Sequence, residues 1–345
     1  MERASISVVI PVFNDAQMLT RCLTAIASST YRPVETIVVD DGSTENLQRV
    51  TDAFGARLIR ISAGPLGPAH ARNVGAAAAT GSHLLFVDAD VLIRPDTLER
   101  FAATFAANPG VSAVFGSYDD EPATPDFVSQ FKNLFHHFVH QNASEEAETF
   151  WSGGGAVKRD VFMAAGGFDD KRYPRPSIED IELGYRLRAA GHRILLNKQI
   201  QVKHLKRWTL RGLVRTDVFD RGAPWTELIL ERRRLPNDLN LHMMQRLSAM
   251  LAYSMLLYLA LVTSLLLFSD LSFPIVAPLL AGAALIVVLN YQLYMFFARQ
   301  RGLTFAVAAL PMHVLYYAYA LVGLTLGGVA FVTNGRRSRV PAKAS

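Results

Sequence analysis

Two close pairs of aspartates stand within the first hundred residues of the sequence. Asp88 and Asp90 are separated by one residue, and Asp40 is followed directly by Asp41. Carboxylate oxygens are the ligands that Mg²⁺ and Mn²⁺ prefer. Successive residues of a strand point to opposite sides, so carboxylates two residues apart face the same way. We therefore expect Asp88 and Asp90 to flank one ion; the alternative is a solvated pair of loop acids.

A third acidic pair, Glu179 and Asp180, stands at the expected start of a helix over residues 181–190. Ser177 lies three residues before Asp180, so the pair also fits a capping box that only starts the helix. Arg72 lies near another predicted helix start. Its guanidinium suits phosphate geometry, or it pairs with one of the acids at the strand ends.

The elements that would position these side chains alternate between strand and helix. Short β-branched runs predict buried strands over residues 6–12, 34–39, 56–61 and 83–87. Helices are predicted between them, over residues 16–28, 47–54 and 69–79. The alternation indicates a doubly wound α/β sheet. The strong strands end in polar residues, and in such sheets ligands bind beyond the carboxyl ends of the strands.

Several motifs follow one another in the order and spacing found in family 2 glycosyltransferases. They are Val8-Val9-Ile10-Pro11-Val12-Phe13-Asn14, Val38-Val39-Asp40-Asp41-Gly42-Ser43-Thr44, Ala71-Arg72-Asn73-Val74-Gly75, Asp88-Ala89-Asp90 and Ser177-Ile178-Glu179-Asp180. The sequence resembles this family over residues 5–214. The resemblance implies a GT-A fold, a doubly wound mixed sheet that uses a nucleotide-sugar donor such as a UDP- or GDP-sugar.

The resemblance also implies roles for single residues. Asp88 and Asp90 would hold Mg²⁺ or Mn²⁺ on the departing diphosphate. Asp180, supported by Glu179, would be the general base of an inverting displacement, a role that matters less if the acceptor is an already ionised lipid phosphate. Asp40 and Asp41, followed by glycine and serine, also have the composition of a plain turn. The residues implied in nucleotide-sugar binding are Pro11, Phe13, Asp40, Asp41, Arg72 and Asp88.

Two later segments add candidates to this site. Trp151 offers a flat apolar face to a sugar ring, and Gly153 and Gly154 permit close backbone approach. The alternative is a strained turn beside a core tryptophan. His204 would be a third metal ligand or a diphosphate contact, as in some relatives, or a structural histidine. Lys206 would meet a phosphate of the donor or acceptor.

The composition indicates that part of the chain lies in lipid. Of 345 residues, 50% are apolar and 19% charged, with a mean hydropathy of +0.19. Three apolar segments, residues 248–268, 273–297 and 304–333, are long enough to span a bilayer. The third contains Pro311 and Gly327-Gly328, so a re-entrant segment is the alternative to a third span.

An amphipathic basic segment, residues 205–247, precedes the spans and suits the membrane interface. It contains Arg221 and Trp225, which loosely resemble the Gln-x-x-Arg-Trp motif of polysaccharide synthases, although no matching glutamine precedes Arg221. The expected organisation is therefore a glycosyltransferase domain over residues 1–204, this interfacial segment, the spans over 248–333 and a basic tail over 334–345.

The net charge of +5 is unevenly distributed along the chain. Residues 1–204 carry 20 Lys and Arg against 24 Asp and Glu, whereas residues 248–345 carry 6 against 1. A nucleic-acid-binding domain would concentrate positive charge, so no nucleic-acid partner is expected. Cys22 is the single cysteine, which excludes a disulfide scaffold and a cysteine-rich zinc site and suits a reducing compartment.

The flanking charges predict the orientation in the membrane. The N-terminal residues lack the pattern of a secretory signal peptide, so the catalytic domain is expected in the cytoplasm. Arginines before the first span agree with this, and the protein is expected to be multi-pass in the cell (inner) membrane. Three spans would place the basic tail outside, against the positive-inside rule; its residues are Arg336, Arg337, Arg339 and Lys343.

The sequence thus favours a membrane-bound inverting glycosyltransferase acting on a lipid-linked or membrane-presented glycan acceptor in cell-envelope polysaccharide or glycolipid synthesis. A processive polysaccharide synthase is the alternative within this class. A non-catalytic sugar-nucleotide-binding protein or a transporter is the alternative outside it. Against transport, His313 is the only ionisable group deep within a predicted span.

Overall fold

The computed structural model describes residues 4–62, 64–233, 242–268 and 276–337 of the chain. The chain divides into two compact units, Met1–Trp208 and Thr209–Ser345, and each is described by itself. Arg339 and Lys343 of the predicted basic tail lie outside the described residues.

The first unit is built on one eight-stranded sheet of order β3-β2-β1-β4-β7-β6-β8-β5. Strands β3, β2, β1 and β4 are parallel, while β7 is antiparallel to both β4 and β6, and β5 is antiparallel to β8. The predicted doubly wound mixed sheet is therefore confirmed. The strands are β1 (Ile6–Val12), β2 (Glu35–Asp40), β3 (Arg57–Arg60), β4 (His83–Val87), β5 (Val91–Ile93), β6 (Val111–Tyr118), β7 (Gly154–Lys158) and β8 (Arg193–His204).

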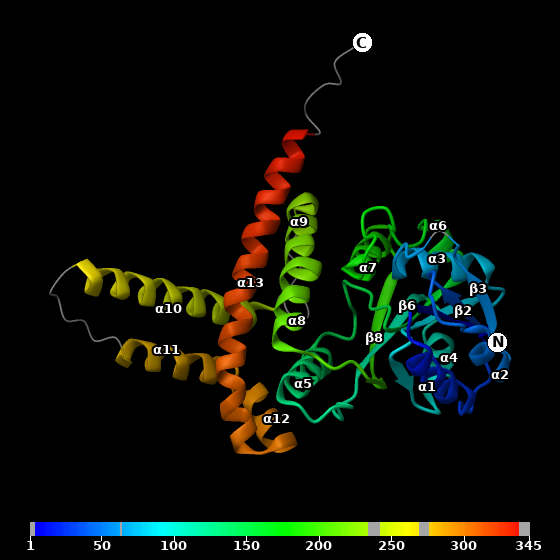
Figure 1. The fold of residues 1–345 in the computed structure, drawn as a ribbon, viewed down its shortest axis with the longest axis horizontal. Helices are drawn as coiled ribbons and strands as arrows, with labels where there is room; N and C mark the ends of the chain where they lie inside the picture. Colours follow the sequence, from blue (N-terminus) through cyan, green and yellow to red (C-terminus); the bar gives the residue numbers. More distant parts are fainter. Residues whose placement is uncertain (1–3, 63, 234–241, 269–275, 338–345) are drawn as a thin grey trace, which may run out of the picture. The chain divides into compact units, whose positions relative to one another are not determined.

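Helices cover both faces of this sheet (Figure 1). Every residue of β1 is buried, and its side chains alternate between two cores because successive strand residues point to opposite faces. Val8 packs in the core that includes Leu19 and Phe101, whereas Val9 packs in the core that includes Phe162 and Leu183. The helices are α1 (Ala16–Ala27), α2 (Gln48–Ala53), α3 (Pro68–Ala78), α4 (Thr97–Ala107), α5 (Phe127–Asn142), α6 (Arg159–Ala164) and α7 (Glu179–Ala189).

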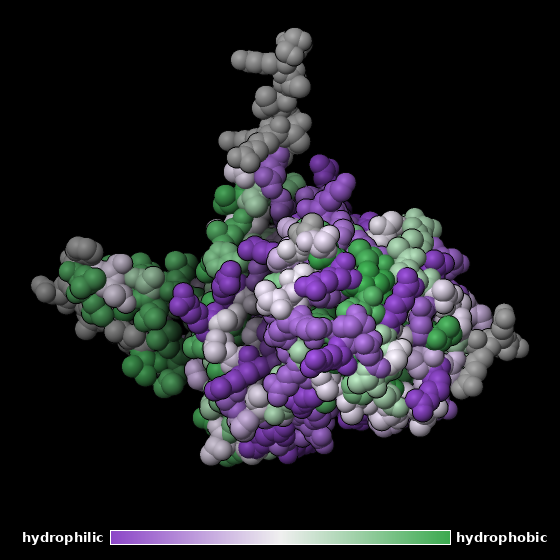
Figure 2. Space-filling model, turned by 45° about the vertical axis from the view of Figure 1, so that its right-hand side comes forward, coloured by the Kyte–Doolittle hydropathy of each residue, from purple (hydrophilic) through white to green (hydrophobic). Residues whose placement is uncertain are grey.

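The second unit is helical, and much of its surface is apolar. Two of its helices are long and apolar enough to cross a bilayer, or three segments if a bent helix pair forms one span. Figure 2 shows the apolar side chains over α10 and α11, the helices at the left of Figure 1. The elements are α8 (Leu210–Arg215), the π-helix η1 (Thr216–Gly222), α9 (Ala223–Arg232), α10 (Met243–Phe268), α11 (Val276–Leu289), α12 (Tyr291–Arg301) and α13 (Leu303–Arg337).

The membrane segments contain one break. In the described part of the predicted span 273–297, α11 and α12 meet at Asn290 with a bend of 79°, and the pair counts as a third span only if both helices form one span together. Buried Asn290 donates its side-chain amide to Ser248 Oγ and to the Ile286 carbonyl, so its polar group is satisfied at the break. In the third segment, α13 continues through Pro311 without interruption, so the re-entrant alternative fails.

The segment predicted at the membrane interface forms α8, η1 and α9, and α9 packs along α13 through glycines. A Cβ on Gly327 would lie 2.4 Å from the Ala223 carbonyl oxygen, and one on Gly323 would lie 3.2 Å from Gly222 Cα. The spacing of these two glycines is the small-xxx-small pattern that lets helices approach closely. Nearby, buried Asp217 of η1 accepts a 2.9 Å hydrogen bond from the Tyr319 hydroxyl.

Candidate active site

Three polar strand ends meet at one edge of the sheet. β1 lies between β2 and β4, so the residues that follow these parallel strands emerge side by side. Asn14 has a left-handed φ of 50°. Its side-chain Oδ1 accepts from the Thr44 backbone amide at 2.8 Å, and its backbone N–H donates to Ser43 Oγ at 2.8 Å. Phe13 is 47% exposed at this edge, whereas Pro11 is buried within β1. The chain therefore presents one exposed aromatic ring beside the acids that follow β2.

Asp40 and Asp41 both organise backbone at this edge. Asp40 accepts from the Ser43 amide at 2.7 Å, and its other oxygen lies 3.5 Å from Arg60. Both oxygens of Asp41 accept from backbone amides, those of Leu66 and Gly67, at 2.8 Å each. The turn expected as an alternative is thus present, and the Asp41 carboxylate also holds the loop that leads into α3.

Arg72 is the centre of a buried ion-pair network. Its Nη1 donates to Glu179 at 2.9 Å and its Nη2 donates to Asp88 at 2.6 Å, while only 4% of the residue is exposed. Burial alone would lower the pKa of this guanidinium, but Asp88 and Glu179 raise it above its ordinary value. Of the two alternatives for Arg72, pairing with a strand-end acid is the one the structure contains.

Asp180 is held by the turn that contains Ser152. Its Oδ2 accepts from the Ser152 amide at 3.0 Å and from the Ser152 hydroxyl at 3.2 Å, and its Oδ1 accepts from the Ile181 amide at 2.8 Å. Burial and the neighbouring Glu179 charge raise the pKa of Asp180 to about 6, against the opposing effect of these hydrogen bonds and Arg72. A carboxylate with a pKa of this size is a competent proton acceptor near neutral pH.

Two details of the acidic pair differ from expectation. Helix α7 begins at Glu179, two residues before its predicted start at Ile181, and its N-cap residue is Ile178 rather than Ser177. Glu179 is buried, with one oxygen on Arg72 and the other accepting from the Ser177 amide at 2.9 Å. Glu179 therefore supports Asp180 through its charge and is itself fully engaged.

The Asp88-Ala89-Asp90 motif lies in a turn between β4 and β5, so the argument from strand alternation is wrong. β4 ends at Val87, and Asp88 leaves the sheet to meet Arg72. Asp90 turns to the other side, where its Oδ2 lies 3.3 Å from His204 Nε2. Burial would raise the pKa of Asp90, but His204 and Lys206 lower it below its ordinary value. The two aspartates therefore contact different partners.

The donor set at this turn fits a divalent cation in part. The 3.3 Å between Asp90 Oδ2 and His204 Nε2 is compatible with two ligands of one ion, whose donors lie about 2.1 Å from Mg²⁺. Asp88 has Oδ1 on Arg72 and keeps Oδ2 for another partner. Within the described ranges, however, no three acidic, histidine or cysteine side chains converge on one point. Two ligands are thus adjacent and the third would have to approach them.

The glycines after Trp151 make room for its ring. A Cβ on Gly153 would lie 2.7 Å from the indole, one on Gly154 would lie 3.1 Å from it, and one on Gly155 would lie 2.2 Å from the Trp151 carbonyl oxygen. Gly153 has no positive φ, so the predicted strain is not present at this turn. The half-buried Trp151 packs against both cores of the domain. These glycines therefore fix the tryptophan that immediately precedes Ser152.

A group of rings next to Trp151 was not predicted. Tyr118, at the end of β6, stacks on His204 with ring centroids 4.5 Å apart and planes 3° apart. The centroid of the Tyr118 ring also lies 4.4 Å from that of His136 of α5 and 4.9 Å from that of Trp151, and the Tyr118 and Trp151 rings are nearly perpendicular. Neither Tyr118 nor His136 stands in a motif with recognisable spacing. The pairing of β6 with β8 brings Tyr118 to the site, and α5, which packs against β6, brings His136.

The structure also describes the three remaining predicted residues, Lys206, Arg221 and Trp225. Exposed Lys206 places its ammonium 4.3 Å from the centre of the Trp208 ring. Arg221 and Trp225 belong to the second unit, where Arg221 Nη1 lies 3.4 Å from Asp217.

The mixed sheet and its helices have a fold of the GT-A type. Over nearly its full length the chain is similar to the mannosyltransferase PcManGT from Pyrobaculum calidifontis, solved in complex with GDP-Man and Mn²⁺, with a TM-score of 0.51 and 20% identity over 97% of this chain and 88% of that one. It is equally similar to residues 1–349 of S. aureus TarS in complex with UDP-GlcNAc, with a TM-score of 0.51 and 14% identity over 98% and 93% of the two chains.

Sequence comparison gives the family. Residues 7–165 match the model of Glycosyl transferase family 2, and this domain of the chain belongs to that family. A glucosyl-dolichyl phosphate glucuronosyltransferase of Haloferax volcanii is 28% identical over 198 residues, which are 52% of this chain and 62% of the relative. A validoxylamine A glucosyltransferase of Streptomyces hygroscopicus is 30% identical over 222 residues, 54% and 52% of the two chains. The matches thus span less than two thirds of these relatives.

Proposed function

We propose that the chain is a membrane-bound inverting glycosyltransferase that moves a sugar from a UDP- or GDP-sugar to a lipid-linked or membrane-presented acceptor. Asp180 takes the proton of the attacking hydroxyl. The charge of Glu179 raises the basicity of Asp180, and Arg72 is paired with Glu179. Phe13, Asp40 and Asp41 receive the nucleotide at the ends of β1 and β2, beside the diphosphate site.

The environment of Asp180 carries this proposal. Its carboxylate is fixed from two sides, by Ser152 and by the first turn of α7, and its pKa lies near 6. It is therefore ionised at neutral pH and still basic enough to accept a proton. The buried Arg72 network joins it to Asp88 at the end of β4. The proposed base, Asp180, and the acid on the diphosphate side, Asp88, are thus joined by the Arg72 network. This arrangement suits displacement at a sugar carbon that lies between the two acids.

Mg²⁺ or Mn²⁺ would be held by Asp90 and His204, with the free oxygen of Asp88 as a further ligand. When bound, the ion would neutralise the charge of the departing nucleoside diphosphate. Asp90 and His204 orient each other across the β5–β8 pair, because Val91 and His204 are register partners. Trp151 and its glycines line the opposite approach, where a sugar ring would lie.

The second unit supports a membrane-presented acceptor. Its long apolar helices would fix the catalytic domain at the bilayer surface. One relative is named for action on a dolichyl-phosphate-linked sugar, which agrees with a lipid-linked acceptor. We place the catalytic domain on the cytoplasmic side of the cell membrane, where nucleotide sugars are made. Protease should then digest residues 1–204 in inside-out vesicles and spare them in intact cells.

A donor screen tests the proposed function. The full-length chain, purified in detergent, is incubated with separate UDP- and GDP-sugars and Mn²⁺ or Mg²⁺, and release of the nucleoside diphosphate is measured. We expect one nucleotide to be preferred and Asp180→Asn to lower turnover. Asp160→Asn removes an exposed carboxylate elsewhere on the domain and serves as the matched control. Absence of nucleotide release from every donor would contradict the proposal.

A further inference from the structure

The imidazole of His204 is oriented by stacking. A histidine ring rotates about χ2 with broad preferences, so the strand backbone alone does not set its plane. Among the hydrogen bonds, ion pairs and ring stacks of the described residues, this ring makes one contact with Asp90 at Nε2 and one with the face of Tyr118. The planes of the two rings differ by only 3° at a centroid distance of 4.5 Å. The Tyr118 ring therefore determines where Nε2 points.

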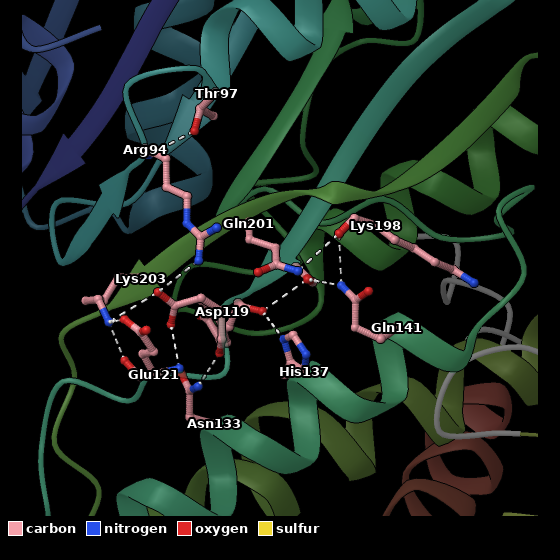
Figure 3. A network of polar contacts seen from close by, with 12 residues as sticks. Arg94, Thr97, Asp119, Glu121, Asn133, His137, Gln141, Lys198, Gln201 and Lys203 are labelled. Carbon is pink, nitrogen blue, oxygen red and sulfur yellow. Dashed lines mark hydrogen bonds and ion pairs between the residues drawn. The ribbon is translucent and has the colours of Figure 1, made fainter. Parts of the chain in front are cut away.

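The neighbouring residues clamp Tyr118 itself. The Tyr118 carbonyl lies 2.7 Å from His137 Nδ1, and the next amide, that of Asp119, donates to the Val202 carbonyl at 2.9 Å. The buried carboxylate of Asp119 lies 3.2 Å from Lys203, the residue before His204. Figure 3 shows Asp119 with Lys203 and Arg94 on one side and Asn133 of α5 on the other. The last residue of β6 and the residue after it thus contact consecutive residues of β8.

The Tyr118 ring is also linked to the proposed base, Asp180, through Trp151 and Ser152. Tyr118 meets the edge of Trp151 at 4.9 Å, and Ser152, the next residue, donates to Asp180 at 3.0 Å. A continuous series of contacts therefore runs from Asp90 through His204, Tyr118 and Trp151 to Asp180. The two ends of this series are the proposed metal ligand and the proposed base.

We propose that Tyr118 is a positioning residue whose ring holds His204 Nε2 beside Asp90 and so sets the metal affinity of the site. The inference rests on the proposed function, because it takes Asp90 and His204 as ligands of the divalent cation. Tyr118 does not itself contact the ion. Outer partners that orient a ligating histidine typically change metal affinity 10- to 100-fold when removed.

Mn²⁺ binding tests this role without relying on turnover. The free Mn²⁺ signal is followed by electron paramagnetic resonance while Mn²⁺ is titrated into the full-length chain with UDP or, separately, GDP. We expect Tyr118→Leu to raise the Mn²⁺ dissociation constant about tenfold or more. Tyr118→Phe keeps the ring and should stay within about twofold of the unmodified chain. Tyr31→Leu removes a buried tyrosine ring near the N-terminal end of β1, where its hydroxyl donates to the Ala4 carbonyl. This variant should also leave the Mn²⁺ dissociation constant unchanged.

The outcomes separate this inference from the proposed function. If Tyr118→Leu binds Mn²⁺ normally while His204→Ala does not, His204 is a ligand but Tyr118 does not position it, and the inference is overturned. An equal loss in Tyr118→Phe and Tyr118→Leu would also overturn it, because the hydroxyl and not the ring would then matter. Normal binding by His204→Ala would remove both residues from the metal site, while nucleotide release and its dependence on Asp180 would stand. Tyr118→Met fills the space without a planar ring and replaces Tyr118→Leu if that variant does not fold.

Discussion

The role of Asp180 as the base predicts a particular pH dependence. Its pKa near 6 means that the carboxyl group is protonated in acid and cannot accept a proton there. Activity, measured as kcat/KM for nucleotide release, should therefore rise with pH and reach half its plateau near pH 6. Burial is the main cause of this raised midpoint, and the charge of Glu179 adds to it.

The size of the effect follows from the titration of one group. At pH 5 about one tenth of the protein would carry an ionised Asp180, so kcat/KM should be about tenfold below the plateau reached above pH 7. An unperturbed aspartate, with a pKa near 3.9, would show no loss at pH 5. In Asp180→Asn the amide cannot accept the proton, and turnover should fall at least about a hundredfold at every pH.

The measurement is a pH series of nucleotide release for the unmodified chain, Asp180→Asn and the control Asp160→Asn. Thermal unfolding is recorded for each protein, so that a folding defect is recognised. A flat profile between pH 5 and 7 would refute the raised pKa of Asp180. Unchanged turnover in Asp180→Asn would refute the role of Asp180 as the base. Unchanged turnover is also the result expected if the acceptor is an already ionised phosphate.

Three further predictions concern contacts around the site and in the second unit. Ser152→Ala removes the hydroxyl that donates to Asp180 at 3.2 Å but keeps the backbone donor, so the midpoint of the pH profile should move upward by up to about one pH unit; an unchanged midpoint would contradict this. Arg72→Met leaves buried Glu179 without its cation, and the melting temperature should fall by about 6 °C or more, as for a loss of about 3 kcal/mol; an unchanged melting temperature would show that Glu179 becomes protonated at little cost. Gly327→Ala should lower the melting temperature in detergent because its Cβ meets the Ala223 carbonyl, whereas Gly328→Ala, where a Cβ meets nothing within 4 Å, should be neutral or stabilising; equal effects would disprove the close packing of α9 on α13.

The parallel half of the sheet was predictable because its signals are local. Strands β1, β2 and β4 are short apolar runs that end in polar residues, and helices of ordinary length separate them. The second half was harder to predict. β6 pairs in parallel with β8, more than eighty residues further along the chain, and in antiparallel fashion with β7, whose glycines give little strand signal. No local pattern specifies such pairings.

The acids of the site were found from the sequence, but their partners were not. Asp180 was recognised from its motif, whereas the Ser152 contact depends on a turn 28 residues away. Tyr118 was missed because a tyrosine at the end of a strand has no distinctive spacing. The bend at Asn290 was missed for a similar reason, since a single asparagine in an apolar run satisfies its amide only through another helix.

The aspartates of the Asp-Ala-Asp motif contact the two sides of the site separately. Asp88 belongs to a buried polar series that runs through Arg72 to Glu179, the neighbour of Asp180. Asp90 belongs to the series of rings that reaches Asp180 from the opposite side through Ser152. After burial, the charge of Glu179 and the hydrogen bond from Ser152 have the largest effects on the pKa of Asp180, in opposite directions, and each series ends on one of these two. A change at Asp88 should therefore act on the base through charge, and a change at Asp90 through the position of Ser152.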